Sequence, residues 1–222
     1  MSLGKQIFFD LDGPILDVSE KYYRLYKDIV SEMGCVPISK TRYWENKRNK
    51  IPETVTLNES RLPEELMPIY SEKRKALIET RRYWELDVVW PELFAYMNDS
   101  PLHGFITLVT LRVNRQALEN ELSFLGIRSW FASVLSSGEE QGQRPGAEIK
   151  IGMIKQHFQR QVKGWFIGDT ETDLRTGQNL GLYCAGVSFG IRTRKILSME
   201  SPNCIISNPS GLVTWLKEIE KR

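Results

Sequence analysis

The stretch from residue 7 to residue 17 constrains the fold of this 222-residue chain more than any other. It opens with three apolar residues, which is typical of a buried β-strand, and continues directly into Asp10, Leu11, Asp12 and Gly13. Side chains alternate along an extended chain, so Asp10 and Asp12 are expected on the same side. Two carboxylates at the end of a buried strand are costly unless a cation or protons compensate them. This stretch therefore indicates a strand end that suits a magnesium ion and a phosphate group.

Apolar runs alternate with amphipathic segments through the second half of the chain. This alternation predicts an α/β fold, with a Rossmann-like parallel sheet and helices on both of its faces. The expected strands cover 104–110, 131–135, 164–168, 182–189 and 204–207. The expected helices cover 91–97, 114–125, 147–158, 174–180 and 209–221. In such sheets, ligands bind beyond the carboxyl ends of the strands.

Residues 18–88 have a different pattern. Apolar residues recur at helical spacing over 20–33, a polar section marked by prolines follows, and a charged helical pattern returns over 63–83. We therefore expect a small α-helical cap domain at 18–88, inserted into a catalytic core domain made of residues 1–17 and 89–222.

Composition excludes several classes of partner. The formal net charge is only +2, so electrostatics favour neither nucleic acid nor a membrane. Three widely spaced cysteines form neither a disulfide framework nor a zinc cluster, which fits a reducing compartment. The N-terminal segment is not typical of a signal peptide and no run has transmembrane length. The expected location is the cytoplasm.

Polar side chains follow the ends of three expected strands. The first strand ends in Asp10 and Asp12, the second in Thr110, and a later one in Asp169, with Asp173 four residues on. One carboxylate can attack phosphorus, a second can transfer protons, and others can hold magnesium. A hydroxyl and a cation would then bind the phosphoryl oxygens.

These motifs resemble those of the haloacid dehalogenase superfamily, in particular its phosphoglycolate-phosphatase-like members with a helical cap. The matching segments are Asp10-Leu-Asp-Gly13, Leu108-Val-Thr110 and Gly168-Asp-Thr-Glu-Thr-Asp173; Pro14 stands where the family often has threonine. The resemblance implies that Asp10 is the nucleophile and Asp12 the general acid/base. It also implies a Mg²⁺ cofactor held by Asp10, the carbonyl of Asp12 and Asp169, with Asp173 in support. The substrate phosphate would meet Gly13, Thr110, Leu111 and a lysine.

The position of that lysine is open. The family pattern often has Lys-Pro between the second and fourth motifs, where this chain has Arg144-Pro145, and Lys150 and Lys155 follow on the next helix. Lys150 is favoured because a compact ammonium suits a site crowded by a carboxylate and a phosphate. Arg144 is the main alternative.

The resemblance implies a magnesium-dependent phosphatase that hydrolyses a small phosphorylated metabolite through an aspartyl-phosphate intermediate. The substrate would be phosphoglycolate-like or a sugar phosphate. A phosphomutase of the β-phosphoglucomutase type uses the same motifs, and a regulatory relative without turnover is a further alternative. Asp12 and Asp169 argue against a true dehalogenase, which lacks the second acid and needs no magnesium.

Overall fold

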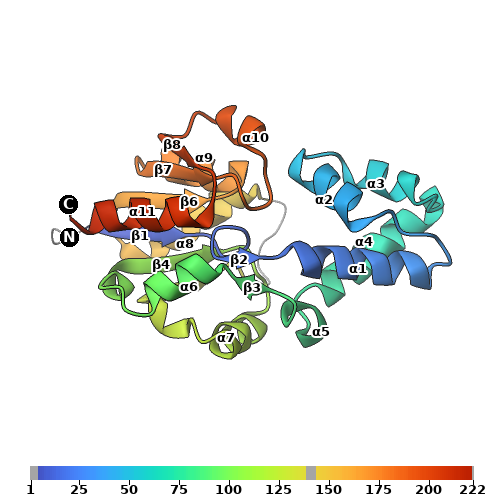
Figure 1. Cartoon of the computed structure of the whole chain (residues 1–222), viewed down its shortest axis with the longest axis horizontal. Coiled ribbons are helices and arrows are strands. Elements are labelled where there is room, and N and C mark those ends of the chain that lie inside the picture. The colour runs from blue at the N-terminus through green and yellow to red at the C-terminus, as the bar shows by residue number, and fades with distance from the viewer. Residues whose placement is uncertain (1–4, 139–143, 222) are drawn as a thin grey trace. The chain divides into compact units, whose positions relative to one another are not determined.

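The computed structural model describes residues 5–138 and 144–221. The chain divides into two compact units (Figure 1). The core unit consists of Met1–Asp17 and Val88–Arg222, and the helical unit of Val18–Asp87. Within the described residues, no helix combines the length and the hydropathy that a bilayer crossing requires.

The core unit is built on a six-stranded sheet with the order β5-β4-β1-β6-β7-β8. Every neighbouring pair is parallel, as the alternating pattern predicted. The strands are β1 (Lys5–Phe9), β4 (Ile106–Thr110), β5 (Ser133–Ser136), β6 (Lys163–Gly168), β7 (Tyr183–Val187) and β8 (Cys204–Ile206).

Helices cover the sheet on both faces (Figure 1). On one face α8 and α9 pack against each other and against the central strands, and α6 and α11 pack together on the other. The helices of this unit are α6 (Pro91–Met97), α7 (Arg115–Phe124), α8 (Gly146–Phe158), α9 (Glu171–Asn179), α10 (Arg194–Ser198) and α11 (Pro209–Glu220), with single 3₁₀ turns at His103–Phe105 and Arg128–Trp130.

Aromatic packing fixes the central strand beneath α8. Phe8 of β1 stacks on Phe166 of β6 with ring centroids 6.2 Å apart, and meets the edge of Phe158 of α8 at 5.6 Å. Phe8 is fully buried, so its truncation to alanine would cost about 3–5 kcal/mol of folding free energy. The run Ile7–Phe9 is apolar at every position because a central strand is covered on both faces, so all three side chains are buried.

Strand order brings the three predicted strand ends together. β1 lies between β4 and β6, with Phe9 opposite both Leu108 and Ile167. Asp10 and Asp169, which follow β1 and β6, and Thr110, the last residue of β4, therefore lie at one edge of the sheet.

A short antiparallel ladder joins β2 (Leu16–Asp17) to β3 (Val88–Val89). It ties the segment that leaves the core unit to the segment that returns to it. The sequence did not predict this ladder, because two-residue strands have no periodicity.

The helical unit contains α1 (Ser19–Glu32), α2 (Lys40–Arg48), α3 (Glu53–Glu59), a 3₁₀ turn at Glu64–Leu66, α4 (Met67–Leu77) and α5 (Arg81–Trp84). Its buried core is rich in tyrosine. Tyr26 of α1 stacks on Tyr43 of α2 with centroids 4.6 Å apart, and its hydroxyl accepts a hydrogen bond from the N–H of Ile38 at 2.9 Å. The sequence predicted α1 well and missed α2 and α3.

Candidate active site

Asp10 follows β1 directly, and hydrogen bonds hold both its backbone and its side chain. Its backbone N–H donates to the carbonyl of Ile167 at 3.0 Å. Its side-chain Oδ1 accepts a hydrogen bond from Nζ of Lys150 at 2.8 Å. Burial raises the pKa of Asp10 to about 7, against the opposing charge of Lys150.

Lys150 lies on α8 and bridges two carboxylates. Besides Asp10, its Nζ donates to Oδ1 of Asp173 at 2.6 Å. The lysine side chain is only 2% exposed, and a buried ammonium needs such partners. Burial lowers the pKa of Lys150, but Asp10 and Asp173 raise it more, so the net pKa lies above its ordinary value. Lys150 is charged at neutral pH.

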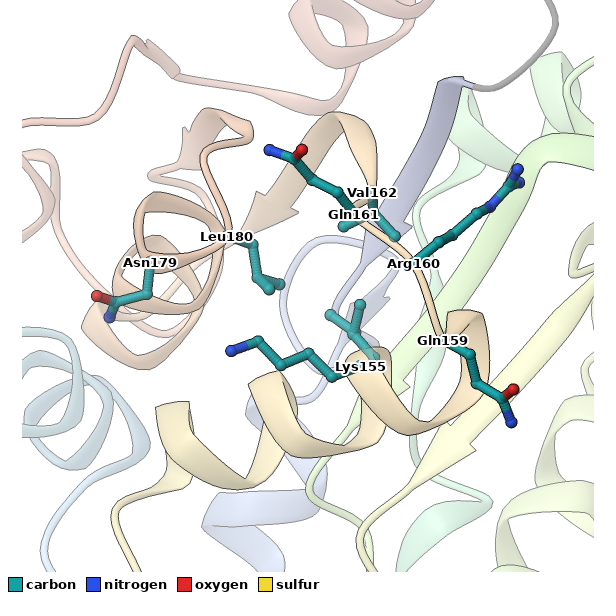
Figure 2. Close-up of a pocket in the computed structure, with 8 residues that line it drawn as sticks. Lys155, Gln159, Arg160, Gln161, Val162, Asn179 and Leu180 are labelled. Carbon is teal, nitrogen blue, oxygen red and sulfur yellow. The ribbon is translucent and has the colours of Figure 1, made fainter.

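The other two candidate cations, Arg144 and Lys155, are exposed, whereas Lys150 is buried. Lys155 lines a cavity of about 420 Å³ formed by the end of α8, the connection to β6 and the end of α9 (Figure 2). That cavity is at the amino end of the strands, opposite to Asp10. Of the three, Lys150 is the one that the structure places on Asp10.

Asp173 is held by the start of α9. Its Oδ2 accepts from the backbone N–H of Thr170 at 3.0 Å and from the Thr170 hydroxyl at 2.6 Å. This reciprocal capping box fixes the first turn of the helix. Asp173 therefore supports Lys150 from a rigid position.

Asp169 is fully buried, and its two oxygens differ. Oδ2 accepts a hydrogen bond from the backbone N–H of Ile191, whereas Oδ1 has no hydrogen-bond partner among the described residues. Burial, together with the nearby charges of Asp173 and Asp10, raises the pKa of Asp169 well above its ordinary value. A buried carboxylate oxygen without a partner is costly and calls for a cation or a proton.

The three acids form a set that fits a divalent metal ion. Asp10, Asp169 and Asp173 each offer a carboxylate oxygen, and these oxygens lie within 4.8 Å of one another. Hard oxygen donors of this kind suit Mg²⁺. The unpartnered Oδ1 of Asp169 makes the fit stronger, because a bound cation would satisfy it.

Two glycines leave room for Asp169. A Cβ atom on Gly13 would stand 1.9 Å from Oδ2 of Asp169, and one on Gly190 would stand 2.3 Å from the same atom. Gly13 also has a φ of +104°, a conformation that favours glycine. Its N–H donates to the carbonyl of Leu16 at 2.9 Å, inside the turn. The resemblance implies that the substrate phosphate meets Gly13, and in this structure the Gly13 N–H closes the turn.

Thr110 and Leu111 lie at the end of β4, as expected. The Thr110 hydroxyl accepts a hydrogen bond from the N–H of Arg112 at 3.3 Å, and its side chain is buried. The Leu111 carbonyl accepts from the hydroxyl of Ser137 at 3.0 Å.

Asp12 has a partner that the sequence analysis did not identify. Arg112 donates to both of its oxygens, from Nε at 2.9 Å and from Nη2 at 2.7 Å. The same guanidinium donates from Nη1 to Oε2 of Glu121 on α7 at 3.1 Å. Two signals were available: a cation two residues after Thr110, and an acid within the apolar stripe of a helix that buries Leu118 and Leu122.

The sequence of the chain matches the model of a known protein family. The model of the haloacid dehalogenase-like hydrolases matches residues 7–187, which include all the acids of the site. The chain belongs to this family. The resemblance seen in the sequence motifs is thereby confirmed, and so is the expected fold.

Individual relatives are distant. A phosphoglycolate phosphatase of Photorhabdus laumondii is 24% identical over 95 residues, which is 43% of this chain and 41% of that protein. The chain therefore matches less than half of the length of this curated relative. A haloacid dehalogenase-like protein from Streptococcus pneumoniae has a TM-score of 0.72 at 20% identity, with 97% of this chain and 100% of that chain covered. A predicted β-phosphoglucomutase from Thermotoga maritima has a TM-score of 0.66 at 17% identity, with coverages of 97% and 98%.

Proposed function

We propose that this protein is a magnesium-dependent phosphatase that hydrolyses a small phosphomonoester through an aspartyl-phosphate intermediate. The relative from Photorhabdus supports a phosphoglycolate-like substrate. In this proposal the helical unit, Val18–Asp87, is the cap that selects the substrate.

One observation carries the proposal. The Asp10 carboxylate, directly after β1, lies beside a buried ammonium. It is also close to two further carboxylates, Asp169 after β6 and Asp173 in the first turn of α9. Such a cluster is poorly suited to a purely structural role, because burying several acids beside one lysine is costly. It does suit phosphoryl transfer, which depends on positioning and charge stabilisation.

The chain's own residues account for each step. A carboxylate oxygen of Asp10 attacks phosphorus and forms an acyl phosphate, while the bond from phosphorus to the leaving oxygen breaks. Asp12 gives a proton to that oxygen, and the alcohol leaves. Asp12 then takes a proton from water, which attacks the acyl phosphate and releases phosphate. Lys150 and Thr110 bind phosphoryl oxygens, and Asp173 holds Lys150 in place.

Mg²⁺ would be held by Asp10, Asp169 and the backbone carbonyl of Asp12, with Asp173 in support. When bound, it would neutralise part of the negative charge that gathers between carboxylates and phosphate.

The test is the variant Asp10→Asn, assayed with a panel of phosphomonoesters in the presence and absence of Mg²⁺. We expect kcat to fall by at least about 1,000-fold with the thermal unfolding midpoint unchanged or raised, because the amide removes a buried ionisable group. Asp99→Asn, at an exposed turn position, is the matched control and keeps wild-type activity. Full activity of Asp10→Asn would contradict the assignment of the nucleophile.

A phosphomutase is the second candidate, since the same acids serve both reactions and a predicted β-phosphoglucomutase shares the fold. Product analysis with sugar phosphates separates the two. Isomerised sugar phosphate would identify a mutase, and released inorganic phosphate would identify a phosphatase.

A further inference from the structure

Asp12, Arg112 and Glu121 form a chain of charged groups that runs from the site into the core unit. Exposure falls along it: the side chains are 15%, 7% and 0% exposed, respectively. The Asp12 carboxylate borders the site, and the Glu121 carboxylate lies on the buried face of α7.

The geometry of the first pair is that of a fork. The Nε and Nη2 atoms of Arg112 face the two oxygens of Asp12, at 2.9 Å and 2.7 Å. Paired hydrogen bonds of this kind fix the plane of a carboxylate as well as its position. The torsion that turns an aspartate carboxylate is otherwise broad, so the fork removes a freedom that Asp12 would have alone.

The second pair fixes the fork itself. Nη1 of Arg112 donates to Oε2 of Glu121 at 3.1 Å, and the backbone N–H of Arg112 donates to the Thr110 hydroxyl at 3.3 Å. A long arginine side chain has many rotamers. Glu121, on a helix, selects one of them.

We propose that Arg112 is a positioning residue that sets the direction of the Asp12 carboxylate, and that Glu121 anchors Arg112. This inference rests on the proposed phosphatase function, because it needs Asp12 to deliver a proton to the leaving oxygen. Arg112 acts through Asp12 and does not bind the substrate. A misdirected Asp12 would therefore lower kcat/KM, which covers the steps up to release of the alcohol, only for esters whose leaving group needs that proton. The later attack of water, which also uses Asp12, is common to all esters.

The leaving group provides the test. The substrates are p-nitrophenyl phosphate, whose phenolate leaves without a proton, and the alkyl phosphomonoester that the wild-type protein hydrolyses fastest. For Arg112→Gln we expect kcat/KM to fall by about 100-fold with the alkyl ester and by less than about threefold with the aryl ester. Arg112→Lys keeps the charge without the fork and is expected to fall between wild type and Arg112→Gln with the alkyl ester.

Two further variants keep the inference testable if Arg112→Gln alone does not fold. Glu121→Gln keeps the Arg112–Asp12 pair and loosens its anchor, so a smaller loss confined to the alkyl ester is expected. Arg112→Gln/Glu121→Gln removes the charge of Glu121 together with that of Arg112, and should reproduce the loss of Arg112→Gln. Arg175→Gln is the matched control, because Arg175 makes a similar fork to Glu200 on the surface; it should leave both substrates unaffected.

Chemical rescue adds a readout that a purely structural role would not give. Millimolar guanidinium should restore alkyl-ester turnover to Arg112→Ala and not to Asp12→Asn. An equal loss of kcat/KM with both esters in the folded variants would overturn the inference, because it would mean that Arg112 binds the phosphate or only supports the fold. A wild-type protein that hydrolyses neither ester would instead overturn the proposed phosphatase function.

Discussion

Lys150 and Asp10 are 140 residues apart in the sequence and 2.8 Å apart in the structure, as the Nζ and Oδ1 atoms of one buried hydrogen bond. Their meeting requires β1 at the centre of the sheet and α8 packed against the neighbouring strands. It also places the charge of Lys150 where an anionic substrate must approach the proposed nucleophile.

Replacing Lys150 with methionine should abolish most of the activity. The variant keeps the length of the side chain and removes the ammonium that offsets Asp10 and Asp173. We expect kcat to fall by at least about 100-fold in steady-state assays with the best phosphomonoester. Arg144→Met and Lys155→Met are matched controls and should retain wild-type kcat. A large loss in Arg144→Met alone would restore the alternative that the sequence left open.

Magnesium should stabilise the folded protein. The bound cation would satisfy Oδ1 of Asp169, and a ligand at about 100 times its dissociation constant adds roughly 2.7 kcal/mol to the free energy of unfolding. We expect millimolar Mg²⁺ to raise the thermal unfolding midpoint by several degrees, and EDTA to reverse the rise. Asp169→Asn should lose this response, whereas Asp99→Asn should keep it. An equal rise in all three proteins would show that the metal acts elsewhere.

The acids and the sheet could be predicted from the sequence because both depend on local pattern. Asp10 and Asp169 directly follow buried strands and Thr110 ends one, so the rule that parallel strands bring their carboxyl ends together was enough to group them. Lys150 was preferred on the size of its charged group, an argument from chemistry rather than from spacing.

The rest depends on tertiary packing. No local sequence pattern predicts that Arg112 pairs with Asp12, 100 residues earlier, or with Glu121 on the following helix. The small size of Gly13 matters because Asp169 comes to lie against it. In the helical unit, α2 has the nearly uniform polar sequence KTRYWENKR, which lacks the apolar stripe that predicts a helix.

Gly190 should tolerate no side chain. A Cβ atom there would stand 2.3 Å from Oδ2 and 2.8 Å from Cβ of Asp169, and both atoms are buried. Gly190→Ala should therefore displace Asp169, lower the free energy of unfolding by about 1–3 kcal/mol and weaken the response to Mg²⁺. Gly152→Ala is the control, because its Cβ would meet nothing within 4 Å on α8. It should stabilise the protein by roughly 0.5–1 kcal/mol in urea titrations. Equal stabilities for the two variants would refute the close packing around Asp169.

Cys184 should make the stability depend on alkaline pH. Burial in β7 and, after it, the nearby Cys204 raise the pKa of the Cys184 thiol from 9.0 to about 11. The folded protein thus holds this proton more tightly than the unfolded chain does. The resulting stability is fully present below pH 9 and is lost as the pH rises towards 11. Urea titrations across this range should show the free energy of unfolding of the wild type falling more than that of Cys184→Ala, by on the order of 2 kcal/mol. Parallel curves for the two proteins would mean that the thiol titrates as it does in the unfolded chain.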